Sequence, residues 1–110
     1  MLIDIELEGL DTLLKAVGLY GDNRIAQQLF NILNGEKACR ETDSINKDVL
    51  VIDGANATVE ELKEIAGLAY GLCTSIDAEQ YPRTVLFTYT LLEGILVEIE
   101  AKKPITGPVH

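Results

Sequence analysis

The segment from residue 84 to residue 102 most constrains the fold of this chain, because its apolar residues fit two different structures. As a helix beginning near Pro82, it would repeat apolar residues at intervals of three or four: Val85, Tyr89, Leu92, Leu96 and Ile99. As a β-hairpin, it would turn at Leu92-Glu93-Gly94, with glycine in the left-handed position of the loop. Four apolar cross-strand pairs would then share one side: Leu91–Ile95, Tyr89–Val97, Phe87–Ile99 and Val85–Ala101.

The hairpin accounts for more of this segment than the helix does. Its opposite side would be mostly polar, with Thr88 facing Glu98, although Leu86 and Leu96 are two apolar exceptions on that outer side. Threonine, valine, phenylalanine and tyrosine are also abundant here, and these residues favour strands over helices. We therefore predict strands over 84–91 and 95–102.

Two further segments have the pattern of strands. At the N-terminus, Ile3, Ile5 and Leu7 alternate with acidic residues, which predicts a strand over 2–8 with one buried face. The run from Val49 to Ile52 is apolar on both sides, as in a covered strand, although four residues alone do not exclude a turn of buried helix. We predict a strand over 49–53.

Three segments have helical periodicity and predict helices near 10–20, 22–34 and 58–73. Asp11 and Asp22 are the predicted N-caps of the first two helices, and Asn34-Gly35 is the predicted end of the second. Thr58 and Glu61 have the spacing of a capping box at the start of the third helix. Gly67 and Gly71 lower helix propensity there, so we expect another backbone to pass close to them.

Together these elements predict an α+β two-layer sandwich, in which three helices cover one face of a small, mostly antiparallel sheet. A chain of 110 residues buries about two thirds of its surface on folding, which suffices for one core. We therefore predict a single domain over 1–110 with a frayed tail over 104–110.

Composition and charge exclude several classes of function. The net charge of −9 opposes binding to nucleic acid phosphates. No stretch is long and apolar enough to cross a membrane, and the acidic N-terminus does not resemble a secretory signal, so we expect a cytoplasmic protein. Cys39 and Cys73 are too far apart in sequence for a zinc knuckle or a redox pair, and we expect two free thiols.

No catalytic set is evident in the sequence. The one histidine is His110, so a histidine-based triad or zinc site in the folded part is excluded. Cys39 lies near Lys37 and Arg40 in a predicted loop over 36–47, where a reactive thiolate is one interpretation and a packing role is another. We assign no catalytic residue, no metal ligand and no cofactor.

The string from Val51 to Asn56 contains Asp53-Gly54-Ala55-Asn56, which resembles the strand-end motif of metal-dependent ribonucleases of the NYN and PIN type. This resemblance implies that Asp53 helps to hold a divalent ion. The resemblance covers only six residues. That family opens with this strand, whereas in this chain about half of the sequence precedes it. A turn between a strand and a helix explains the same residues.

The remaining feature is a set of acidic residues on the outer face of the predicted sheet: Asp4, Glu6, Glu8, Glu98 and Glu100. Such a face would attract a basic partner, or would be merely a solvated surface that prevents edge pairing. We predict a small, non-enzymatic interaction module, of the inhibitor, immunity or adaptor type, that binds a basic protein partner. The alternatives are a homo-oligomeric subunit that binds a small ligand and, less favoured, a metal-dependent nuclease that uses Asp53.

Overall fold

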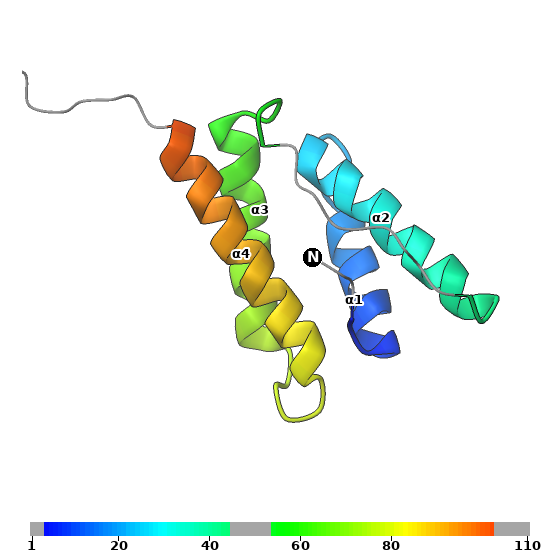
Figure 1. Ribbon diagram of the computed structural model, residues 1–110. Helices are drawn as coiled ribbons and strands as arrows, with labels where there is room; N and C mark the ends of the chain where they lie inside the picture. Colours follow the sequence, from blue (N-terminus) through cyan, green and yellow to red (C-terminus); the bar gives the residue numbers. More distant parts are fainter. Residues whose placement is uncertain (1–3, 45–53, 103–110) are drawn as a thin grey trace, which may run out of the picture.

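The computed structural model describes residues 4–44 and 54–102, and these residues form four α-helices and no strand. The helices are α1 (Leu7–Gly18), α2 (Arg24–Glu41), α3 (Val59–Ser75) and α4 (Pro82–Lys102). Figure 1 shows two helical hairpins, α1 with α2 and α3 with α4, that lie side by side. The N-termini of α1 and α4 lie at one end of the molecule, and those of α2 and α3 lie at the opposite end (Figure 1).

One hydrophobic core joins the two hairpins. Each helix contributes at least four buried apolar side chains to a single cluster, and Ile5 and Ala57 add to it from outside the helices. Leu10, Ile25, Leu62 and Ile95 are inaccessible to solvent. Burial of one such side chain stabilises the fold by about 1.5 to 3 kcal/mol, so the four helices depend on one another for stability.

The predicted α+β sandwich is wrong. The predicted strands over 84–91 and 95–102 are parts of one continuous helix, α4. Of the predicted strand over 2–8, residues 4–6 have no regular structure and α1 begins at Leu7. The predicted strand over 49–53 and the predicted frayed tail over 104–110 lie outside the described residues.

Helix α4 buries a different set of residues from the one that the hairpin predicted. Its buried residues recur at helical spacing: Thr84, Phe87, Thr88, Leu91, Ile95 and Ile99. Thr88, which the hairpin placed outside, has no solvent exposure. Its hydroxyl donates to the Val85 carbonyl oxygen at 2.9 Å and lies 3.1 Å from Cys73 Sγ. A threonine whose hydroxyl is hydrogen-bonded in this way packs like a small apolar residue. Thr84 and Thr88 therefore both belong to the core, although their side chains are polar.

The three predicted helices exist, with different ends. Glu6 rather than Asp11 is the N-cap residue of α1, and Asn23 rather than Asp22 caps α2. Helix α2 does not stop at Asn34-Gly35 but continues to Glu41, and within this extension Glu36 pairs with Arg40 at 3.0 Å. The capping box at the start of α3 is confirmed.

The expectation for Gly67 and Gly71 is also wrong, because a Cβ at either position would meet nothing within 4 Å. The close approach occurs at Gly9 instead. A Cβ there would lie 2.7 Å from Thr84 Cβ, so glycine is required where α1 passes the start of α4.

Candidate interaction surface

The five acidic residues predicted to share a sheet face lie in two separate regions. Asp4, Glu6 and Glu8 surround the start of α4, whereas Glu98 and Glu100 lie near its end. At 1.5 Å per residue, the fifteen positions from 83 to 98 correspond to ~22 Å along the helix. No sheet in the described part of the chain joins these acids, and their role in binding a partner stays a prediction.

Glu6 connects the N-termini of two helices. Its backbone forms the N-cap of α1, while its side chain reaches the start of α4. One carboxylate oxygen accepts hydrogen bonds from the Thr84 N–H at 2.8 Å and the Thr84 hydroxyl at 2.7 Å. The other accepts from the Arg83 N–H at 3.1 Å and from Arg83 Nε at 3.0 Å. Because Pro82 has no N–H, Glu6 satisfies the first backbone donors that α4 presents.

The charges around this contact reinforce one another. Burial raises the pKa of the Glu6 carboxyl, but the hydrogen bonds from Thr84 and Arg83 outweigh it and lower the pKa from 4.5 to about 2. Arg83 also pairs with Asp4 at 2.9 Å, and its bonds to Glu6 and Asp4 raise the pKa of the guanidinium. The Tyr81 hydroxyl donates to Glu8, which raises the pKa of that phenol. We call Asp4, Glu6, Glu8, Tyr81, Arg83 and Thr84 the Glu6 junction.

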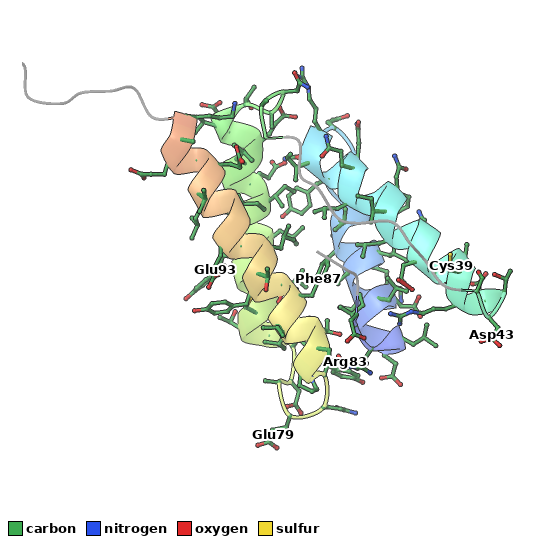
Figure 2. The ribbon with its side chains drawn as sticks, viewed as in Figure 1. Cys39, Asp43, Glu79, Arg83, Phe87 and Glu93 are labelled. Carbon is green, nitrogen blue, oxygen red and sulfur yellow. The ribbon has the colours of Figure 1, made fainter. Side chains whose placement is uncertain are left out.

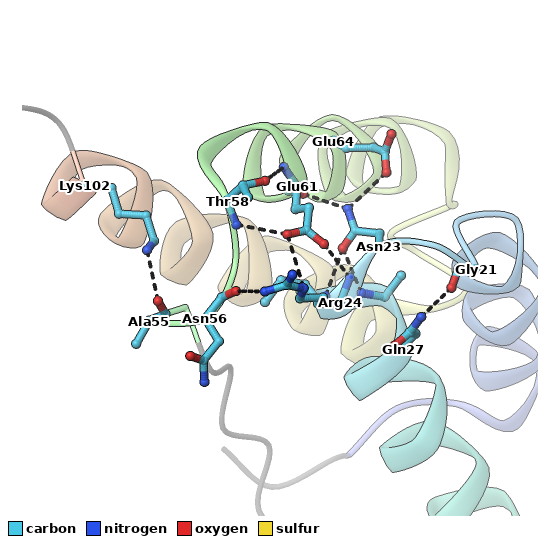
Figure 3. A network of polar contacts seen from close by, with 12 residues as sticks. Gly21, Asn23, Arg24, Gln27, Ala55, Asn56, Thr58, Glu61, Glu64 and Lys102 are labelled. Atoms are coloured by element: carbon cyan, nitrogen blue, oxygen red, sulfur yellow. Dashed lines mark hydrogen bonds and ion pairs between the residues drawn. The ribbon is translucent and has the colours of Figure 1, made fainter.

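A second polar contact joins α2 and α3 at the opposite end of the molecule (Figure 3). The buried Asn23 amide oxygen accepts from the N–H groups of Ile25 and Ala26 at 2.9 and 3.1 Å, which caps α2. Its amide nitrogen donates to the Glu61 carbonyl oxygen at 2.9 Å and to Glu64 Oε1 at 3.0 Å. Asn23 therefore caps its own helix and bonds α3, just as Glu6 is the N-cap residue of α1 and its side chain bonds α4.

Glu61 completes this second contact. Its carboxylate accepts from the Thr58 N–H at 3.0 Å and from the Arg24 N–H at 2.9 Å, and these two bonds lower the pKa of Glu61. Arg24 Nη1 donates in turn to the Asn56 carbonyl oxygen at 2.6 Å (Figure 3). We call Asn23, Arg24, Asn56, Thr58, Glu61 and Glu64 the Asn23 junction. Both junctions hold the N-terminus of one helix with groups from another part of the chain. In both of them a carboxylate, that of Glu6 or that of Glu61, stabilises the fold.

The outer side of α4 has a different character. We define the α4 outer face as Leu86, Tyr89, Glu93, Leu96 and Val97. Its four apolar members are between 51% and 67% exposed. At 100° per residue the five positions fall within about 100° of the helix circumference, opposite the buried residues. An exposed apolar stripe of this kind marks a binding surface more often than scattered apolar residues do.

Glu93 lies in the middle of this stripe. Figure 2 shows it on the side of α4 that is away from the α1 and α2 hairpin. None of the ion pairs found among residues 4–44 and 54–102 includes Glu93. The α4 outer face therefore combines exposed apolar side chains with a central carboxylate. The sequence contained a signal for it, because Leu86 and Leu96 were the apolar exceptions on the outer side of the predicted hairpin.

Two of the hollows that the described residues form lie near helix ends. One, of about 370 Å³, lies between the end of α1 and the start of α2, and Val17, Tyr20, Ala26 and Phe30 contribute to its lining. The other, of about 320 Å³, lies beside the Glu6 junction and is lined in part by Glu8, Asp77 and Tyr81.

The residues singled out for chemistry do not meet in a site. Cys39 lies within α2 rather than in a loop, and Cys73 lies within α3 against Thr88. In the described part of the chain, no three histidine, cysteine, aspartate or glutamate residues are grouped so that they could hold a metal ion. Asp53 and His110 lie outside the described residues.

Comparisons with protein families, curated proteins and solved structures find no match to this chain. Among the described helices, none is both long and apolar enough to span a lipid bilayer.

Proposed function

We propose that this chain is a non-catalytic interaction module that binds a basic protein partner through the α4 outer face. The observation that carries the proposal is the stripe of exposed Leu86, Tyr89, Leu96 and Val97 around the Glu93 carboxylate. Its position on the longest helix, opposite the core, leaves the stripe accessible without any rearrangement of the fold.

Two physical terms support association at this face. Apolar surface that is removed from water contributes roughly 25 cal/mol for each Å², so a partner that covers the four apolar side chains gains affinity. The net charge of −9 attracts a basic partner over a distance and raises its association rate. The apolar side chains then favour the bound state, while the charge favours encounter.

The test begins with capture of proteins from the native host's lysate on the full chain, followed by purification and titration of each captured protein. The decisive variant combines Leu86→Ser, Leu96→Ser and Val97→Ser. Leu19→Ser is the matched control, because Leu19 is 83% exposed but lies just after α1. Thermal unfolding of both variants checks that the fold is kept.

We expect a captured partner to lose at least tenfold in affinity for the triple variant and to bind the Leu19→Ser chain as it binds the wild type. Raising the salt concentration should slow association with the wild type. Capture of no protein, or equal affinities for the triple variant and the wild type, would overturn the proposal.

A second candidate function is the binding of a small apolar ligand in the hollow between α1 and α2. Its volume of about 370 Å³ and its aromatic lining by Tyr20 and Phe30 favour this candidate. A fluorescent apolar dye, anilinonaphthalene sulfonate, should bind the wild type and lose affinity when Gly18→Leu fills the hollow. Equal dye binding by the two chains would eliminate this candidate.

A further inference from the structure

The chemistry of the α4 outer face also identifies the kind of segment that fits it. We infer that the partner contributes an amphipathic helix whose apolar side carries a lysine or arginine opposite Glu93. This inference rests on the proposed function and makes it specific.

Backbone hydrogen bonding favours a helix as the binding segment. The described residues contain no strand, so they offer no sheet edge to which an extended peptide could add. A segment that lies against exposed leucine, tyrosine and valine side chains has few polar groups within reach of its own backbone. A helix satisfies its backbone groups internally, whereas an extended segment would leave many of them unpaired.

The spacing of the stripe sets the length of that helix. The eleven positions from Leu86 to Val97 correspond to ~16 Å along α4, or about three turns. A partner helix of three to four turns that packs beside α4 would cover this length. Its contact residues would repeat at intervals of three and four, like the stripe itself.

Glu93 determines the charge of the partner helix. A carboxylate covered by an apolar helix would lose solvation, which is costly unless a cation pairs with it. A second copy of α4 fits this requirement poorly. In an antiparallel pair centred on the stripe, each Glu93 would lie within about one turn of the other, and the two like charges would repel. A lysine or arginine in the middle of the partner's apolar side compensates the lost solvation of Glu93 and avoids the repulsion between two carboxylates.

The experiment uses two synthetic peptides of sixteen residues that differ at one position. Both carry leucines at helical spacing on one side and neutral polar residues on the other. The Lys peptide has lysine in the middle of the leucine side, and the Glu peptide has glutamate there. Each peptide is titrated into the isotopically labelled full chain, and amide chemical shifts report both affinity and location.

Two charge-reversal variants sharpen the titration. Glu93→Lys changes the centre of the α4 outer face. Glu79→Lys changes the net charge by the same amount in the loop between α3 and α4, at one end of the molecule (Figure 2). The comparison separates a local pairing with Glu93 from general attraction to an acidic protein.

With the wild type, we expect shift changes at the α4 outer face and at least tenfold tighter binding of the Lys peptide than of the Glu peptide. Glu93→Lys should reverse this preference, and Glu79→Lys should preserve it. Equal binding of the two peptides, no binding, a preference that Glu93→Lys does not change, or shift changes elsewhere would overturn the inference. The proposed function would survive any of these results if a captured partner still lost affinity for the triple serine variant.

Discussion

The two ends of the molecule are held by similar contacts that depend on charge to different degrees. At the Glu6 junction, a carboxylate accepts four hydrogen bonds from the start of a helix that is distant in sequence. At the Asn23 junction, a neutral amide caps its own helix and also donates to the neighbouring helix. Asn23 is only 3% exposed, whereas the Glu6 side chain is 18% exposed and the Arg83 side chain that pairs with it is 57% exposed.

This difference shows that one fold can join helix N-termini in two ways. Removing the Asn23 amide leaves polar groups without partners in a buried place, and the cost of such groups does not depend on pH. Weakening the Glu6 junction requires only that the carboxylate be protonated or that salt screen its ion pairs. We expect the neutral Asn23 amide to contribute a stability that does not depend on pH. The Glu6 contact should contribute a stability that depends on pH, as should the Glu61 carboxylate, whose pKa is also lowered in the folded protein.

Replacement of the buried amide should have the largest effect. Asn23→Ala removes the cap of α2 and both donors to α3, and we expect a loss of about 2 to 3 kcal/mol in the free energy of unfolding. Urea denaturation of the variant and the wild type measures it. Asp22→Ala is the control, since Asp22 is exposed and is not the N-cap residue. Equal losses for Asn23→Ala and Asp22→Ala would contradict a special role of the Asn23 amide at the start of α2.

A methyl group at Gly9 should disturb the opposite end. The added Cβ would lie 2.7 Å from Thr84 Cβ, so α1 and α4 must separate and the bonds from Thr84 to Glu6 must lengthen. Overpacking costs about 1 to 3 kcal/mol, and this contact belongs to the upper half of that range because the added Cβ falls below 3.0 Å, a separation that real Cβ atoms keep. Alanine regains about 1 kcal/mol of helix propensity, which predicts a net loss of about 1 to 2 kcal/mol for Gly9→Ala. Thermal or urea denaturation checks this prediction, and an unchanged midpoint would contradict the close contact.

Acid should lower the free energy of unfolding by less than Asn23→Ala or Gly9→Ala does, because the Glu6 junction is partly open to solvent. The folded protein lowers the pKa of Glu6 from 4.5 to about 2, so the ionised carboxylate is favoured in the folded state. Its contribution is fully present above pH 4.5 and is lost as the pH falls toward 2. The urea midpoint of the wild type should therefore decrease across this interval.

Glu6→Gln tests the assignment of this acid dependence. The variant should be less stable than the wild type at neutral pH and should lose less stability on acidification. Glu79→Gln, in the exposed loop before α4, should keep the acid dependence of the wild type. If Glu6→Gln kept it too, the acid sensitivity would come from other carboxylates.

The smallest expected effect is a gain, at a position that belongs to neither junction. Gly67 lies on α3 where an added Cβ meets nothing within 4 Å. Gly67→Ala should therefore raise the free energy of unfolding by about 0.5 to 1 kcal/mol through helix propensity alone. The same substitution at Gly9 should lower it, and the opposite signs, measured under the same conditions, separate an open helix surface from a tight contact.

The sequence predicted those elements whose signals are local. Helix α3 has its cap, its first acidic residues and its apolar stripe within one segment, and the capping box of Thr58 and Glu61 is present as predicted. Helix α1 and most of α2 were predicted for the same reason. The buried faces of these helices follow from apolar periodicity, which needs no knowledge of the rest of the chain.

Helix α4 was not predicted because the interactions that stabilise it are distant in sequence. Its start is capped by Glu6 rather than by a neighbouring residue, and Thr88 is buried against Cys73 of α3. Strand propensity and the apparent loop at Leu92-Glu93-Gly94 both favoured a hairpin. The same error displaced the predicted acidic face, since Glu6 was assigned to a solvated strand surface rather than to a helix terminus.

The separation of Glu6 and Thr84 by 78 positions also affects the kinetics of folding. Each helical hairpin closes over a short stretch of chain, whereas this contact requires a long loop to close and should form late. A contact that is absent from the transition state changes the unfolding rate and leaves the folding rate nearly unchanged. The Glu6 junction would then set how long each folded molecule persists, and resistance to proteolysis under strong protease would depend on it.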